Sequence, residues 1–416
     1  MQKMEKAILV GLETPSSAQF AYHMEELKNL AKACGIEVLE TVTQRLDGPT
    51  SATYIGVGKV EEIKQMITTL EANLVIFDDE LSPSHIRNLE KGLEAKVIDR
   101  TILILDIFAS RAKTKEAMLQ VELAQSEYML PRVVGMYSSL SRQKSGTGSK
   151  GPGETKLELD KRFLRNKIHH IKEELKTIVS VRRTQREKRK KDQILTVALT
   201  GYTNSGKSTI LNKMLEYSVQ NTEKYVFEKD MLFATLETAT RSISLQNNHQ
   251  FLVTDTVGFI SKLPHHLVDA FKSTLEEIKE ASLILHIVDG SNPQAMNQAL
   301  VVDEVLHSLE VVNIPVIYVI NKSDLCLEPP SLKLDPRITI SALTGAGFER
   351  LMKLIDETLY SGNRLVTLLL PYGKGQIYSF LNDHANIRKV EYCNDGIKIE
   401  VELNDHLSSL YKEYIL

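Results

Sequence analysis

The N-terminal part of the chain alternates short apolar runs with amphipathic stretches. The apolar runs predict strands at 7–11, 37–42, 74–77 and 96–98. The amphipathic stretches predict helices at 17–34, 59–70 and 84–94. Short strands that alternate with helices are typical of a parallel sheet in an α/β domain. We therefore expect residues 1–112 to form a small α/β domain.

After residue 112 the apolar positions take the spacing of two long helices. The first helix, about 113–141, has Leu119, Leu123 and Leu130 at compatible positions. The second has apolar residues at coiled-coil spacing, namely Leu157, Leu164, Ile168, Ile171, Leu175 and Ile178. The glycine-rich segment 144–153 between them is not expected to be helical. These features predict an antiparallel helical hairpin over 113–192 with a glycine-rich tip.

The rest of the chain predicts two further domains. Apolar runs predict buried strands at 194–199, 250–255, 316–320 and 338–340, and a helix is expected from residue 209. After residue 360, strands are expected at 365–370, 388–392 and 396–403, and helices at 375–384 and 407–414. We therefore expect an α/β domain over 193–360 and a small α+β domain over 361–416.

The segment Gly201–Ser208 has the pattern of a phosphate-binding loop and stands between a predicted strand and a predicted helix. Its glycines let backbone N–H groups surround an anion. Lys207 is expected to reach the β- and γ-phosphates, and Ser208 to bind Mg²⁺. A glycine-rich turn with an incidental lysine is the alternative. The nucleotide-binding candidates here are Gly201, Tyr202, Thr203, Asn204, Ser205, Gly206, Lys207, Ser208 and Thr209.

The motif Asn321–Asp324 indicates which base is bound, because it follows a predicted strand. The carboxylate of Asp324 can accept hydrogen bonds from N1–H and the 2-amino group of guanine, which adenine lacks. As an isolated tetrapeptide it could also be an ordinary turn. Backbone N–H groups after the strand at 338–340 are expected to reach the guanine oxygen. The base-binding candidates are Asn321, Lys322, Ser323, Asp324, Ser341, Ala342 and Leu343.

The segment Asp255–Gly258 has the D-x-x-G arrangement at the end of a predicted strand. Upstream of it, Thr235 is expected to close onto the metal when γ-phosphate is present, as in a GTPase switch, with an ordinary strand-edge threonine as the alternative. The further nucleotide-binding candidates are Phe233, Ala234, Thr235, Leu236, Glu237, Asp255, Thr256, Val257 and Gly258. The candidates for catalysis are Lys207, Thr235 and Gly258. The candidates for Mg²⁺ are Ser208, Thr235 and Asp255.

Phe259 occupies the position where many GTPases carry a glutamine that orients the attacking water. Because an aromatic ring cannot do this, a backbone group, a monovalent cation or a partner surface must position the water. Asn204 could bind K⁺ against the phosphates, or it could bond to its own backbone as loop asparagines often do. We expect a slow GTPase that a partner activates.

Charge and composition restrict the partners. The chain has 416 residues and a net charge of −3, so nucleic-acid contacts must come from local basic patches. Such patches occur at the hairpin tip and just before residue 193, and the candidate RNA-binding residues are Arg142, Lys144, Lys150, Arg182, Arg183, Arg186, Lys188, Arg189 and Lys190. The alternatives are a plain linker for the tip and a solvated helix face for the second run.

Three cysteines without metal-ligand spacing suggest a reducing compartment. The N-terminus does not resemble a signal peptide and no long apolar run is present, so a cytoplasmic protein without a membrane span is expected. The segment Gly56–Lys59 resembles a phosphate turn, but a structural turn is the preferred interpretation over a second nucleotide site.

The chain resembles the HflX family of translation-associated GTPases, in the Obg–HflX branch. The segments that carry the resemblance are 54–62, 97–101, 105–112, 120–124, 151–155, 232–236 and 255–259, of which the Gly-Pro-Gly-Glu-Thr run at 151–155 is the most specific. The chain departs from the usual pattern at 237–240 and at the tip residues 145–149.

The resemblance implies a GTPase whose N-terminal part binds the large ribosomal subunit and whose hairpin tip reaches toward the peptidyl transferase centre. Such a protein splits or rescues stalled ribosomes under stress, and some members protect ribosomes from antibiotics acting at that centre. The expected fold class is α/β, with a P-loop GTPase domain after the hairpin. Off the ribosome we expect a monomer that binds GTP or GDP. The alternative function is a general RNA-binding GTPase, acting in ribosome assembly or RNA handling, that does not split ribosomes.

Overall fold

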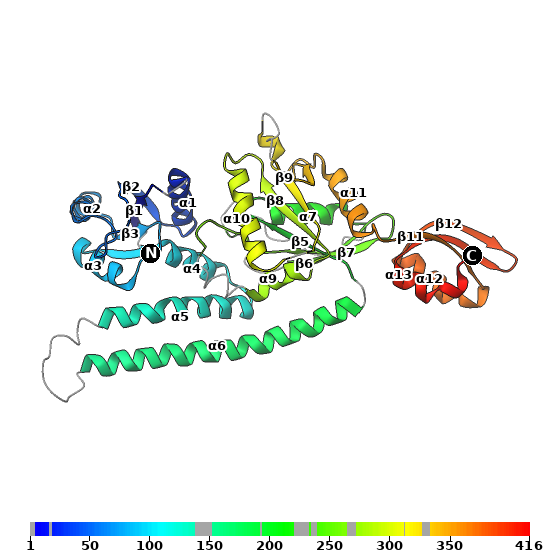
Figure 1. Ribbon diagram of the computed structural model, residues 1–416, viewed down its shortest axis with the longest axis horizontal. Coiled ribbons are helices and arrows are strands. Elements are labelled where there is room, and N and C mark those ends of the chain that lie inside the picture. Colours follow the sequence, from blue (N-terminus) through cyan, green and yellow to red (C-terminus); the bar gives the residue numbers. More distant parts are fainter. Residues whose placement is uncertain are drawn as a thin grey trace. The chain divides into compact units, whose positions relative to one another are not determined.

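The computed structural model describes most of the chain as two compact units (Figure 1). The described residues are 5–15, 19–137, 152–191, 194–219, 233, 239–263, 272–311, 313–326 and 333–416. The first unit comprises the described residues up to 184 together with 233, 261–263 and 272–273, and the second comprises the others.

The first unit begins with a four-stranded parallel sheet of order β2-β1-β3-β4. Its strands are β1 (Lys6–Glu13), β2 (Glu37–Arg45), β3 (Leu74–Phe77) and β4 (Lys96–Asp99). Its helices are α1 (Phe20–Ala33), α2 (Val57–Leu70), α3 (Pro83–Leu93) and α4 (Arg100–Arg111). Ile8 and Val10 pack with Ile63 of α2 and Leu89 of α3 in one core. The expected α/β fold of this region is confirmed.

Helix α4 lies between the predicted strand at 96–98 and the predicted helix from 113, where the sequence pattern indicates no separate element. The side chain of Asp99 begins this helix by accepting a hydrogen bond from the Ile102 N–H at 3.0 Å. Seven residues of α4 are buried, including Leu103, Leu105 and Phe108. A helix buried on most sides has no clear polar face, so its periodicity is weak in the sequence.

The turn before α2 contacts β2 through Gly56. The Gly56 N–H donates to Gln44 Oε1 at 2.8 Å. A Cβ on Gly56 would lie 2.9 Å from Gln44 Nε2. The glycine therefore serves this packing contact between the turn and β2.

Two long helices, α5 (Lys115–Tyr137) and α6 (Pro152–Lys191), lie side by side (Figure 1). Leu119 and Leu123 of α5 pack with Ile171 of α6. Because α6 begins at Pro152, the expected non-helical segment 144–153 is too long at its end. Proline favours the first position of a helix, where its missing N–H costs nothing. The remaining residues of that segment lie outside the described residues.

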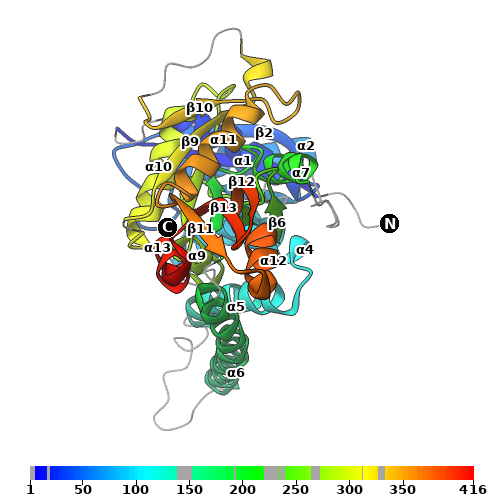
Figure 2. The same ribbon diagram turned by 90° about the vertical axis from the view of Figure 1, so that its right-hand side faces the viewer.

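The second unit contains a six-stranded sheet of order β10-β9-β8-β5-β7-β6, in which only β6 runs antiparallel to its neighbour. Figure 2 shows β10 beside β9 at one edge of this sheet. Its strands are β5 (Thr196–Gly201), β6 (Ala239–Ser244), β7 (Gln250–Asp255), β8 (Leu283–Asp289), β9 (Val316–Asn321) and β10 (Arg337–Thr339). Its helices are α7 (Lys207–Tyr217), α9 (Lys272–Lys279), α10 (Ala295–Ser308) and α11 (Phe348–Leu359). Residues of α7 and α11 share one core with the sheet, and α10 contributes to another. This sheet confirms the predicted α/β nucleotide-binding fold.

A small antiparallel sheet of order β11-β13-β12 ends the chain. Its elements are β11 (Arg364–Leu370), α12 (Gly375–His384), β12 (Asn386–Cys393), β13 (Gly396–Leu403) and α13 (Asp405–Leu410). The helix expected at 407–414 is shorter and begins earlier, because the Asn404 side chain accepts from the Leu407 N–H at 2.8 Å. Within the described parts of the chain, no helix has the length and apolarity needed to cross a bilayer.

Candidate nucleotide-binding site

The phosphate-binding motif lies between β5 and α7, in the strand–loop–helix context that was predicted. Gly206 has a φ of +96°, and a Cβ there would lie 2.2 Å from Asn321 Nδ2. Gly201 has a φ of +148°, and its Cβ would lie 2.3 Å from the carbonyl oxygen of Ile287. Both glycines of the motif are therefore required by backbone conformation and by close packing.

Lys207, at the start of α7, holds its amine against the loop. Its Nζ donates to the carbonyl oxygens of Gly201 at 3.2 Å and Tyr202 at 2.8 Å. Burial lowers the pKa of Lys207 to about 8, and the carboxylate of Asp255 opposes this shift only in part. The protein places too little negative charge around this ammonium group to stabilise it fully, and bound phosphates would supply more.

Nucleotide binding is therefore expected to take up a proton in mildly alkaline solution. Phosphates raise the pKa of Lys207, so the amine that is partly neutral in the free protein becomes charged in the complex. With a pKa of about 8 in the free protein, binding of GDP takes up protons above that pH, and affinity falls as pH rises further. Calorimetry in two buffers of different ionisation enthalpy measures this uptake. Lys207→Arg is the matched control, since arginine stays charged; equal uptake by both proteins would contradict the assignment.

A hydroxyl and a carboxylate meet beside the loop and fit a magnesium ion. Ser208 Oγ donates to Asp255 Oδ2 at 2.7 Å, and Asp255 is fully buried at the end of β7. Oxygen ligands are what Mg²⁺ prefers, and it takes few from protein because phosphates and water supply the rest. Among the described residues, no three or more His, Cys, Asp or Glu side chains form a group that could hold a metal ion. When bound, Mg²⁺ would neutralise charge on the β- and γ-phosphates.

Backbone hydrogen bonds of Phe259, the residue after the D-x-x-G segment, connect this segment to the phosphate loop. The Phe259 N–H donates to the Gly201 oxygen at 3.1 Å, and the Thr203 N–H donates to the Phe259 oxygen at 2.7 Å. A Cβ on Gly258 would lie 2.9 Å from Lys207 Nζ. The Phe259 side chain is 2% exposed and lies in the interior, so it does not orient water.

Asn321 joins the phosphate loop to the predicted base-binding loops, a role that the sequence motif did not show. Its Nδ2 donates to the Ser205 oxygen at 3.0 Å, and its Oδ1 accepts from the Ala342 N–H at 3.0 Å. The side chain is 2% exposed. These contacts join residues that are distant in the chain, and no local sequence signal reveals them.

Charged and hydroxyl groups hold the predicted base-binding loop in place. Ser341 Oγ donates to Asp324 Oδ1 at 2.5 Å and thereby orients the carboxylate. Lys322 Nζ forms an ion pair with Asp289 Oδ2 at 2.8 Å. Asp289 was missed in the sequence, although it ends the apolar run of β8. The Ser341 and Ala342 N–H groups have protein acceptors, Ala346 and Asn321, so their expected bond to guanine would have to replace or share these contacts.

The remaining candidates are placed as follows. Asn204 is exposed with a φ of +60°, a left-handed conformation that asparagine tolerates, whereas Tyr202, Thr203 and Ser205 are buried. Phe233 belongs to the first unit, where its ring centroid lies 4.6 Å from that of Phe108. Outside the described residues lie Ala234, Thr235, Leu236, Glu237, Arg142, Lys144 and Lys150. Described in backbone only, on α6, are Arg182, Arg183, Arg186, Lys188, Arg189 and Lys190.

Comparison with known proteins identifies the family. Family models described as the N-terminal and middle regions of a GTP-binding GTPase match residues 21–109 and 111–189, and one described as a 50S ribosome-binding GTPase matches 196–322. The GTPase HflX of Caldanaerobacter subterraneus is 44% identical over 99% of this chain and 94% of its own length. The chain belongs to the HflX family. The HflX GTPase of Escherichia coli is 38% identical over 96% of this chain and 93% of its own.

Membership of the HflX family, with the P-loop fold, makes the protein an enzyme that binds GTP and GDP and hydrolyses GTP. A GTPase of this fold typically requires Mg²⁺. Among solved structures, a GTP-binding protein from Sulfolobus solfataricus in complex with GDP aligns at 24% identity with a TM-score of 0.44, covering 86% of this chain and 99% of that one. At that TM-score, the assignment to HflX rests on the sequence relatives.

Proposed function

We propose that this HflX GTPase associates with the large ribosomal subunit and separates the subunits of stalled ribosomes under stress. One of its matching family models is described as a 50S ribosome-binding GTPase. The observation that carries the proposal is the hairpin of α5 and α6, which a GTPase domain does not need for hydrolysis. Protection against antibiotics that act at the peptidyl transferase centre is a further consequence of the same reach.

The hairpin has the properties of a stiff arm. Helix α6 has 40 residues and therefore extends for about 60 Å. Besides the apolar seam, Lys115 pairs with Glu174 at 2.7 Å and Lys167 pairs with Glu122 at 2.8 Å, both between the two helices. An arm of this kind can carry the segment 138–151 to a defined distance, as insertion into an RNA-lined cavity requires.

The basic residues assigned to RNA complete the proposal. The run 182–191 follows the end of the seam on α6, where lysines and arginines would neutralise rRNA phosphates. Binding to the subunit should therefore weaken as salt concentration rises. We place the protein in the cytoplasm as a monomer off the ribosome.

For hydrolysis, we propose that Thr235, Ser208 and Asp255 hold the magnesium ion. A monovalent cation or a ribosomal group then positions the attacking water. The burial of Phe259 supports the need for such a group. K⁺ at Asn204 is the specific form of this proposal. The left-handed backbone of Asn204 gives a second reason for asparagine at this position.

Shortening 144–151 to a tight turn is expected to abolish ribosome splitting while leaving GDP affinity unchanged. The nucleotide-site candidates other than those at 233–236 belong to the second unit, whereas the tip is needed only for reach. Subunit separation on density gradients with GTP measures splitting. A charge control, Lys144→Gln with Lys150→Gln, keeps the length and separates reach from phosphate contact.

Full splitting by the shortened protein would make the tip a linker and overturn the proposal. If the intact protein binds ribosomal subunits and RNA equally and splits nothing, the general RNA-binding GTPase is the better description.

A further inference from the structure

The β-hairpin of β6 and β7 extends from the nucleotide site to contacts with α11 and with the C-terminal strands and helices. Strand β6 follows the predicted switch segment 233–237, and β7 ends at Asp255. In this pair Ala239 lies opposite Asp255, and Ser244 lies opposite Gln250. Six residues of extended strand span about 20 Å, so the hairpin tip at 245–249 is well separated from Asp255.

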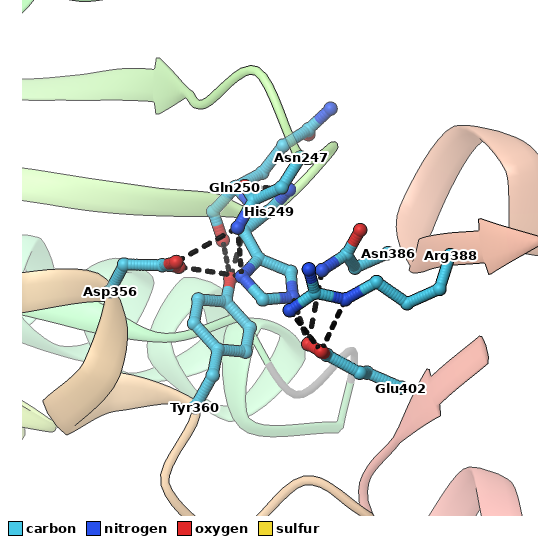
Figure 3. A network of polar contacts seen from close by, with 8 residues as sticks. All are labelled: Asn247, His249, Gln250, Asp356, Tyr360, Asn386, Arg388 and Glu402. Carbon is cyan, nitrogen blue, oxygen red and sulfur yellow. Dashed lines mark hydrogen bonds and ion pairs between the residues drawn. The ribbon is translucent and has the colours of Figure 1, made fainter. Parts of the chain in front are cut away.

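The tip is bound tightly to the end of α11 (Figure 3). His249 Nδ1 lies 2.6 Å from Asp356 Oδ1, and Asn247 Nδ2 donates to Asp356 Oδ2 at 2.8 Å. The Tyr360 ring stacks on His249 with centroids 3.7 Å apart, and its hydroxyl donates to the Gln250 oxygen at 2.7 Å. Burial raises the pKa of Tyr360, so the hydroxyl remains a donor.

The same tip also contacts the C-terminal domain, residues 364–416. His249 Nε2 lies 3.8 Å from Glu402 Oε2 on β13. Figure 3 shows the two side chains pointing toward each other. Arg388 donates to Glu402 Oε1 at 2.8 and 2.7 Å, which fixes the carboxylate. A second contact comes from Asn248, whose Nδ2 donates to the Asn382 oxygen of α12 at 3.0 Å. The C-terminal domain therefore meets the tip through two elements.

The β6–β7 tip is a rigid turn that contacts both domains. His249 is 4% exposed and lies between the carboxylates of Asp356 and Glu402, one from each domain. The turn is closed by the Leu245 N–H, which donates to the His249 oxygen at 2.8 Å. A closed turn on a two-stranded hairpin transmits displacement better than a loose loop would, because few of its torsions can absorb motion.

We propose that the cluster of Asn247, Asn248, His249, Asp356, Tyr360 and Glu402 couples the nucleotide state to the position of the C-terminal domain. Exchange of GDP for GTP acts on the start of β6 and the end of β7, which lie together at the open end of the hairpin. The tip at 245–249 transfers that change to β13 and α12. The C-terminal domain thereby reports the nucleotide state to whatever it contacts. This coupling requires only the GTPase site and does not depend on ribosome splitting.

Thermodynamic reciprocity gives the test. If the nucleotide changes the tip contact, then weakening the contact must change the ratio of the Kd values for GDP and a non-hydrolysable GTP analogue by the same factor. For His249→Ala and for Glu402→Gln, each in the full chain, we expect this ratio to change about fivefold or more. Arg364→Ala, which removes an exposed pair with Asp405 on the same domain, is the control and should leave the ratio unchanged.

Hydrogen exchange supplies a second readout. In the wild type, protection of 386–403 should differ between the GDP and analogue states, and the difference should vanish in His249→Ala. Should that variant not fold, Asn248→Gly keeps the positive φ of +61° and removes only the bond to Asn382, so a smaller ratio change of the same sign is expected. Ratios within twofold of wild type in every folded variant, with nucleotide-independent exchange, would overturn the proposal.

Discussion

Replacing Lys207 by alanine is expected to lower the single-turnover rate of GTP hydrolysis at least about a hundredfold, because it removes a preorganised positive charge from a buried site. Phosphate release at saturating GTP measures the rate separately from affinity. Lys213→Ala is the matched control, since Lys213 stands on the same helix and pairs with Glu216 at 2.6 Å. A rate for Lys207→Ala within threefold of wild type would remove this residue from the chemistry.

The same assay tests the other two hydrolysis assignments. Thr235→Ala is expected to lower the rate strongly if this threonine binds the metal. If Asn204 places a cation, wild-type turnover is faster in potassium than in sodium, and Asn204→Ala removes the difference. Equal rates of the wild type in both salts would leave the left-handed backbone as the reason for Asn204.

Asp324→Asn is expected to reverse the base preference, with GDP affinity lowered about a hundredfold and xanthosine diphosphate favoured. The carboxylate accepts from two guanine donors, whereas an amide presents a donor that suits the C2 oxygen of xanthine. Ser341 holds Asp324 Oδ1 at 2.5 Å, and the amide oxygen of asparagine can keep this bond. Competition binding with both nucleotides measures the change.

A neighbouring substitution separates base reading from loop structure. Asp289→Asn removes the charge partner of Lys322 without touching the proposed base contact. It should weaken both nucleotides to a similar degree and keep the preference for guanine. If Asp324→Asn behaves in the same way, Asp324 supports the loop and does not read the base.

The burial of Phe259 determines which substitution can test its role. From the sequence, its replacement by alanine is expected to leave the chemistry largely intact, because the ring cannot orient water. In the folded protein the ring is 2% exposed, so alanine would leave a cavity that costs about 3–5 kcal/mol of folding free energy. Phe259→Leu is the better probe, since it retains most of the buried volume.

The sequence alone determined the parts of this protein that depend on neighbours in the chain. Strand and helix periods, the glycines at 201 and 206, and the order of the three motifs specified the P-loop fold and the family, because each signal is contained in a short segment. The start of α6 at Pro152 and the whole of α4 were not predicted, because a capping proline and burial on most sides give no clear period.

Tertiary structure decided the contacts between segments that are remote in the chain. Asn321 binds Ser205 and Ala342, and His249 lies between Asp356 and Glu402, although nothing near these residues in the sequence indicates their partners. The physical reason is that a side chain's hydrogen bonds and burial depend on which strands and helices the fold brings together, while periodicity and turn chemistry act over only a few residues.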